Sequence, residues 1–217
     1  MAQDTVNLYN LALSAAGQRA RVSLPDERSR EAELCNMWFP QTYKQVLRAA
    51  RWASASAHDA LTLVAEREGD WTPGQPDPEF QFAFALPNGC LHPRYLYGFD
   101  RFRVSLLAPD RLALMTNLEQ PILYFTMDQP RIEMWDAQLY FAVAYALGAN
   151  IVMPISGKPS LARSLIEQAN MYIAAARESA ANESFDGFAS LPGGRDWTVP
   201  GQRFIYPDGP MLGMNNV

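Results

Sequence analysis

Apolar residues recur at two different periods along this 217-residue chain, and the change of period is what most constrains its fold. Near the N-terminus, Leu8, Leu11, Ala12 and Ala15 share one face at helical spacing. Between residues 80 and 86, phenylalanine or leucine alternates with glutamine or alanine, which predicts a strand with one apolar face. Helical spacing then returns. The sequence predicts an α+β protein, mainly α, in which a bundle of about four helices carries an inserted antiparallel β region.

The first two helices have recognisable ends. We expect the first over residues 5–16, with Asp4 capping its start and Gly17 in the left-handed conformation after its end. The second should begin just after Pro25, with two acidic residues in its first turn, and continue to about residue 51. Pro40 falls inside it, so we expect either a kink or two abutting helices.

The third and fourth helices follow the β region. Residues 133–153 are apolar almost all round, and their alanines allow neighbouring elements to approach closely: Ala137, Ala142, Ala144, Ala146 and Ala149. The length suits a membrane span, but Asp136, Gln138 and Asn150 favour a buried core helix. Ser160 is the expected cap of the last helix. Its apolar stripe comprises Leu161, Leu165, Ala169, Tyr172, Ile173 and Ala176.

Turn residues divide the β region. Pro87-Asn88-Gly89 predicts a turn, followed by a strand over residues 90–97. Further short strands are expected at 101–107, 111–115 and 122–127, with the spacing of an antiparallel meander. The glycine- and proline-rich stretch 68–78 is expected to be an exposed loop.

The last 36 residues, 182–217, differ from the rest because ten of them are glycine or proline. Disordered linkers are poor in aromatic residues, yet this stretch contains five: Phe185, Phe188, Trp197, Phe204 and Tyr206. We expect an extended segment that docks either on another protein or on its own bundle. The expected organisation is one domain, 1–181, made of a bundle (3–53 and 133–181) and a β-rich insertion (54–130), followed by this tail.

Composition and motifs point away from catalysis. The net charge of −5 disfavours a protein that grips nucleic acid by its phosphates, and the arginines of residues 19–30 are offset by nearby acids. Cys35 and Cys90 are interpreted as buried reduced thiols. His58 and His92 lie at no metal-ligand spacing from either cysteine. We therefore predict no metal, no cofactor and no catalytic residue.

Two further motifs have ordinary structural interpretations. Residues 156–160 look like the end of a phosphate-binding loop, but Val152 replaces the required glycine and Pro159 interrupts the lysine–serine pair, so a turn between helices is expected. Glu66, Glu68 and Asp70 cluster in a loop where nothing would raise a carboxyl pKa, which favours surface solvation over a glycosidase pair.

Several runs, taken in order, resemble podovirus head-to-tail adaptors, also called tail tubular protein A. They are residues 8–17, the second helix with Cys35 and Trp38-Phe39-Pro40, the following Trp52-Ala53, residues 84–91, and the helices from Leu139 to residue 181. Ser54 stands where the family usually has phenylalanine, and Gly89 where it usually has aspartate. The resemblance covers residues 3–181.

The resemblance implies a structural virion protein at the head–tail junction, made in the host cytoplasm. Such proteins form a dodecameric ring beneath the portal and connect it to the tail tube or nozzle, while DNA passes through the ring without specific binding. The C-terminal segment of relatives can insert against the portal. We therefore hypothesise portal binding through the five aromatic residues of 182–217. No signal peptide or membrane partner is expected.

A second hypothesis concerns aromatic residues of the β region. Phe99, Phe102, Tyr124 and Phe125 could contact the next tail component or a neighbouring subunit, or could simply fill a local core. Two alternative functions also stay open. A tail-associated peptidoglycan hydrolase would need a cleft with a buried acid, and a non-viral helical binding module would not need the aromatic tail.

Overall fold

The computed structural model describes residues 2–69, 72, 75–108 and 111–189. The chain divides into two compact units, residues 1–180 and 181–217. Of the second unit, only the backbone of residues 181–189 is described, and it is helical. Within the described residues the fold contains four α-helices and two antiparallel sheets, so the chain is a mixed α+β protein.

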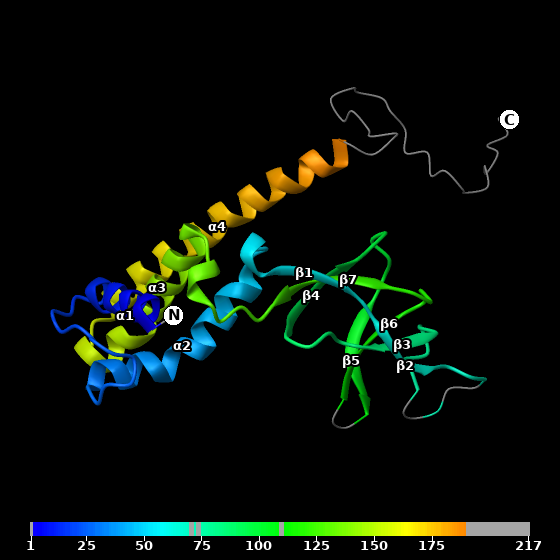
Figure 1. The fold of residues 1–217 in the computed structure, drawn as a ribbon, viewed down its shortest axis with the longest axis horizontal. Helices are drawn as coiled ribbons and strands as arrows, with labels where there is room; N and C mark the ends of the chain where they lie inside the picture. Colours follow the sequence, from blue (N-terminus) through cyan, green and yellow to red (C-terminus); the bar gives the residue numbers. More distant parts are fainter. Residues whose placement is uncertain (1, 70–71, 73–74, 109–110, 190–217) are drawn as a thin grey trace, which may run out of the picture. The chain divides into compact units, whose positions relative to one another are not determined.

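The helices α1 (Ala2–Ala15), α2 (Arg30–Ala49), α3 (Ala137–Ser156) and the first two-thirds of α4 (Pro159–Ala189) share one hydrophobic core (Figure 1). Both α1 and α2 pack against α3, which is buried along most of its length. Gly148 brings α1 and α3 together, since a Cβ there would lie 3.0 Å from the Ala12 carbonyl oxygen. The predicted stripe of α4 is confirmed, because Leu165, Ala169 and Ala176 are buried.

The helix α3 is long and apolar enough to cross a membrane, but half of its most apolar window is buried inside the fold. Nine of its residues are buried, including Leu139, Leu147 and Ile151. This agrees with the expected core helix. It begins later than predicted, after Asp136, whose carboxylate accepts a hydrogen bond from the Leu139 amide at 2.8 Å.

Helix ends were predicted better at glycine than at polar caps. Gly17 is left-handed, with φ 76°, and the next amide bonds the Leu13 carbonyl at 2.9 Å, as expected. The predicted cap Asp4 lies instead within α1, because the helix already begins at Ala2. Likewise Ser160 lies inside α4, because Pro159 opens it and needs no amide bond there.

The predicted start of α2 after Pro25 is wrong. The helix begins at Arg30, where the Ser29 hydroxyl accepts a hydrogen bond from the Ala32 amide. The Glu27 carboxylate accepts from the amides of Ser23 and Leu24, so it closes a local turn that competes with helix formation. Pro40 lies within a single helix, Arg30–Ala49, rather than between two abutting helices.

Seven strands form the two sheets: β1 (Ser56–Ala60), β2 (Thr62–Glu66), β3 (Phe82–Ala85), β4 (Cys90–Leu96), β5 (Arg103–Ala108), β6 (Arg111–Thr116) and β7 (Ile122–Met127) (Figure 1). Their orders are β1-β7-β4 and β2-β3-β6-β5, with antiparallel pairs throughout. The predicted meander is therefore wrong. After β6 the chain leaves the second sheet, and β7 inserts between β1 and β4 in the first.

The prediction that β3 has a single apolar face is also wrong. The consecutive residues Ala83 and Phe84 are both buried, so both faces of the strand are covered. The β region accordingly has two small cores. One is centred on Phe80, Ala83 and Met115, and the other on residues of both sheets: Leu96, Leu114, Leu123 and Phe125.

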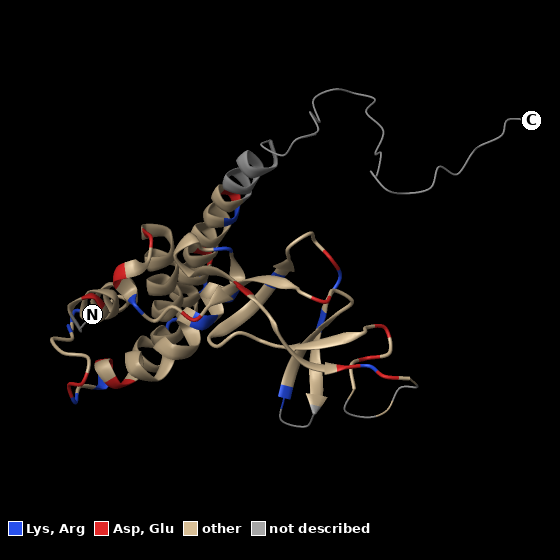
Figure 2. Cartoon of the chain, turned by 45° about the vertical axis from the view of Figure 1, so that its right-hand side comes forward, with Lys and Arg blue, Asp and Glu red and all other residues tan. Residues whose placement is uncertain are grey.

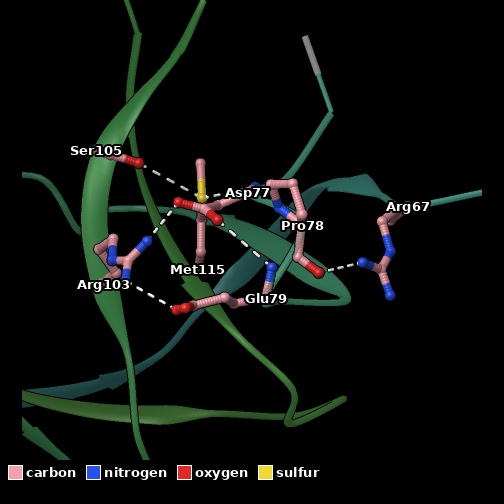
Figure 3. A network of polar contacts seen from close by, with 7 residues as sticks. All are labelled: Arg67, Asp77, Pro78, Glu79, Arg103, Ser105 and Met115. Carbon is pink, nitrogen blue, oxygen red and sulfur yellow. Dashed lines mark hydrogen bonds and ion pairs between the residues drawn. The ribbon is translucent and has the colours of Figure 1, made fainter. Parts of the chain in front are cut away.

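The stretch expected to be an exposed loop is partly tied to the second sheet, as Figure 3 shows. Arg103 of β5 forms ion pairs with Asp77 at 2.5 Å and Glu79 at 2.8 Å, and Arg67 donates to the Pro78 carbonyl. The three charged side chains are 27–56% exposed, so each ion pair contributes little to stability. The burial of Phe80 against the sheet gives the segment its main anchor.

Candidate interaction surface

Four aromatic rings form a continuous stack across the outer face of the sheet β1-β7-β4. His58, Tyr124 and Tyr95 are direct cross-strand neighbours on three adjacent strands. Ring centroids are 5.2 Å apart between His58 and Tyr124, 4.7 Å between Tyr124 and Tyr95, and 5.1 Å between Tyr95 and Phe99. We call these four residues the aromatic row.

The aromatic row lies opposite the local core. Side chains alternate across a sheet, so Leu96, Leu123 and Phe125 point the other way and are buried. Phe99 remains 65% exposed at one end of the row, and the nearby Tyr97 is 68% exposed. The fold therefore displays aromatic surface here that its own cores do not use.

Phe99 also has an unusual backbone conformation. Its φ is 61°, the only positive value among described residues other than glycine, and it follows the left-handed Gly98. Such a conformation costs a bulky residue about 1–2 kcal/mol. The surrounding hydrogen bonds hold it there, since the Phe99 amide donates to the Leu96 carbonyl at 2.9 Å. Strained residues of this kind occur often at functional surfaces.

The structure places two of the four aromatic residues hypothesised to form a β-region interface in the aromatic row and two in a core. Phe99 and Tyr124 belong to the aromatic row, whereas Phe125 is buried and Phe102 packs against the same core. The alternative in which these residues fill a local core holds for the latter pair. The sequence prediction missed Tyr95 and Tyr97, which could have been found from their alternate positions in a predicted strand.

The end of α2 lies beside the aromatic row. Three side chains from elsewhere in the chain donate to its last carbonyl groups. The Trp52 indole donates to Val46 at 3.0 Å, Arg94 of β4 to Leu47, Arg48 and Ala50 at 2.6–3.2 Å, and Arg177 of α4 to Ala49 at 2.7 and 3.0 Å. These bonds satisfy carbonyls that a helix leaves without partners, and they join β4 and α4 to α2.

Arg51 connects this helix end to the row. Its guanidinium lies over the Tyr95 ring, 5.4 Å from the centroid, and donates to the Tyr95 hydroxyl at 3.2 Å. We call Arg48, Arg51, Arg94 and Arg177 the arginine cluster. Burial lowers the pKa of Arg94, and the positive charges of Arg51 and Arg177 lower it further. Arg94 and Arg48 likewise add to the burial that lowers the pKa of His92.

A further anchor joins the strands to the bundle. The Tyr43 hydroxyl donates to Asp128 at 2.8 Å, and Lys44 pairs with the same carboxylate at 3.1 Å. Burial and the Asp128 carboxylate both raise the pKa of Tyr43. Together with the Arg94 hydrogen bonds, these contacts attach α2 to β4 and to Asp128, the residue that follows β7.

Other candidate chemical groups have structural surroundings. Burial raises the pKa of Cys35 to about 12 and that of Cys90 to about 11, which makes both poor nucleophiles. Among the described residues, no group of three histidine, cysteine, aspartate or glutamate side chains lies close enough together to hold a metal. Residues 156–160 form the predicted turn, with Gly157 left-handed at the end of α3.

The residues hypothesised to bind the portal are only partly described. The helix α4 continues to Ala189, so residues 182–189 are helical rather than extended. Phe185 and Phe188 therefore lie on a helix, although their side chains are not described. Trp197, Phe204 and Tyr206 lie outside the described residues.

Comparison with known protein families and with curated proteins found no match to this chain.

Proposed function

We propose that this chain is a structural subunit of a phage virion, a head-to-tail adaptor that forms a ring with other copies and connects the portal to the tail tube or nozzle. In this proposal the protein is not an enzyme and needs no cofactor. The observation that carries it is the aromatic row beside Arg51, which is exposed at both ends, His58 and Phe99, and half-buried at Tyr124 and Tyr95 between them.

Exposed tyrosine, phenylalanine and arginine side chains favour a protein interface. These residue types are enriched where protein surfaces meet, and they dominate the binding energy measured by alanine scanning. Tyr97 and Phe99 belong to neither small core of the β region, and each stays about two-thirds exposed, Phe99 even though it stacks on Tyr95. We assign this surface to the tail tube or nozzle protein, or to a neighbouring subunit.

Portal binding is assigned to the C-terminal residues, following the family resemblance. The structure changes how this should be tested. Truncation after Asn182 would remove part of α4, whereas truncation after Ala189 leaves the helix at full length. The second truncation is the better test, because loss of binding is then less easily attributed to damage to the bundle.

The experiment measures mass by light scattering for the purified protein alone, with its portal ring, and with the portal ring plus the nozzle protein. The full chain is expected to join the portal in ring stoichiometry, and the chain ending at Ala189 to fail. Phe99→Ser combined with Tyr97→Ser should leave portal binding intact and block addition of the nozzle or the neighbouring subunit. A full chain that never associates with the portal would refute the adaptor proposal.

A further inference from the structure

The arginine cluster gathers four positive charges in a protein whose net charge is −5. In Figure 2, acidic and basic residues are otherwise scattered over the helices and strands. Arg94 and Arg177 donate to the carbonyls of consecutive residues, Arg48, Ala49 and Ala50, which brings their guanidinium groups close together. Arg48 and Arg51 project from the same end of α2 and are both exposed.

Within the described residues, no carboxylate pairs with an arginine of this cluster. Asp128 is already paired with Lys44. The negative end of α2 offers only about half a unit charge, far less than the four positive charges beside it. Capping the helix therefore explains the positions of Arg94 and Arg177, but not the charge of Arg48 and Arg51.

Hydroxyl groups extend the donor surface. Arg51 donates to the Tyr95 hydroxyl, which leaves the proton of that hydroxyl available to a further acceptor. Tyr97, two residues further along the chain, is exposed. Arginine and tyrosine side chains are common donors to nucleic-acid phosphates, and such contacts are independent of base sequence.

We propose that the arginine cluster, with the hydroxyls of Tyr95 and Tyr97, binds the phosphate backbone of nucleic acid without sequence preference. Arg48 and Arg51 carry the contact, while Arg94 and Arg177 hold the helix end in place and add to the positive field. The site contradicts the expectation from net charge alone, because the charge that matters to a phosphate is local. The proposal concerns the isolated chain, so it does not depend on ring assembly.

The test is fluorescence anisotropy of a labelled duplex of about 20 base pairs, titrated with the full chain from about 50 mM salt upward. Binding should weaken as salt rises, with a logarithmic slope of about −0.9 for each phosphate contact. Arg48→Gln combined with Arg51→Gln should reduce the steepness of that slope by about two and weaken binding at least tenfold at the lowest salt.

A matched control removes the same amount of charge elsewhere. Arg163 and Lys158 are exposed near the start of α4, and Arg163 lies about 20 Å along the helix from Arg177. The combination of Arg163→Gln and Lys158→Gln should bind DNA like the parent chain, and thermal unfolding should show that both double variants are folded. Absence of duplex binding by the parent chain, or an equal loss in the control, would overturn the proposal.

A single strand of the same length separates backbone from base recognition. Duplex binding at least as tight as that of the single strand supports phosphate contact, because the duplex carries the higher density of phosphates. Binding of the single strand alone would overturn it in favour of bases stacking on the exposed rings of Tyr97 and Phe99.

Discussion

Replacement of Arg94 by methionine should cost about 2–3 kcal/mol of the free energy of unfolding, more than is usual for a half-buried arginine. The side chain makes three hydrogen bonds to the carbonyls of Leu47, Arg48 and Ala50 and one to the Thr126 hydroxyl. A hydrogen bond from a charged donor contributes about 1.5–3 kcal/mol, but such values do not add within one network. Methionine retains the length of the apolar stem and removes only the guanidinium.

Two opposing effects keep the expected loss below the sum of four bonds. Removing the cation relieves repulsion from Arg51 and Arg177 and the cost of burying its charge. Water can reach part of the helix end and replace some lost bonds. In the other direction, the end of α2 loses a favourable charge, which is worth about 0.3–1 kcal/mol. The net loss corresponds to a fall in Tm of about 5–10 °C for a chain of this size.

Urea unfolding followed by circular dichroism and tryptophan fluorescence measures the loss. Trp52, one of five tryptophans in the chain, is buried at this junction and contributes to the fluorescence change. Agreement between the two probes tests two-state unfolding. Arg94→Lys should lose about half as much, since lysine keeps the charge but not the planar fork of donors. Arg163→Met, on the exposed surface of α4, is the control. A loss below about 0.5 kcal/mol for Arg94→Met, or one equal to the control, would refute the reasoning.

Three further predictions concern the cores. At pH 8 the thiols of Cys35 and Cys90 should react with a disulfide reagent about a hundredfold more slowly in the folded protein than in urea, because their raised pKa values keep them protonated. Burial raises the pKa of Tyr9 and Tyr43 in the folded protein, so these two residues keep protons that unfolded tyrosines lose above about pH 10. The free energy of unfolding should therefore not change through tyrosine ionisation below about pH 9 and should fall above about pH 10. A urea midpoint that stays constant from about pH 9 to 11 would contradict this. Gly148→Val should lower the free energy of unfolding in urea by about 1–3 kcal/mol, because the valine side chain would meet the backbone of α1. An unchanged urea midpoint would show that α1 and α3 can move apart without loss of stability.

The sequence predicted helix positions well where the end residues and the apolar pattern of a helix match its observed ends and buried face. Gly17 and Gly157 terminate α1 and α3 where glycine is the natural left-handed residue, and α3 is buried as its composition indicated. The start of α2 was missed because Glu27 has an acidic side chain suited to a first turn but uses it in the preceding loop. A carboxylate near a helix start does not reveal which amide it will meet.

The strands β1 and β2 were not predicted, and this error produced the false meander. Both are edge strands, β1 of the first sheet and β2 of the second, and most of their residues are partly or fully exposed. An edge strand with little buried surface needs no regular apolar alternation, so residues 56–66 lacked the expected pattern. Pairing partners across a sheet depend on tertiary contacts that local spacing does not contain.

In the candidate surface, residue type alone did not predict which aromatic side chains are exposed. Tyr124 and Phe125 are adjacent aromatics in one strand, so at most one of them could face outward, yet both were assigned to an interface. Only the burial of Phe125 beneath the sheet decides between them. Arg94 carried no sequence signal at all, because its carbonyl acceptors at the end of α2 lie more than forty residues away along the chain.

The roles inferred for the arginine cluster can be separated because the four side chains use their donors differently. Arg94 and Arg177 direct theirs at the carbonyls of α2, so replacing them should weaken the fold before it alters any ligand. Among the described residues, the polar contacts of Arg51 are with Tyr95, which lies outside the bundle core, and Arg48 is exposed. If the cluster served stability alone, replacing Arg48 and Arg51 would relieve repulsion around Arg94 and leave the protein as stable or more so. These two charges, which no described carboxylate neutralises, are therefore better explained by an anion outside the chain than by the requirements of the fold.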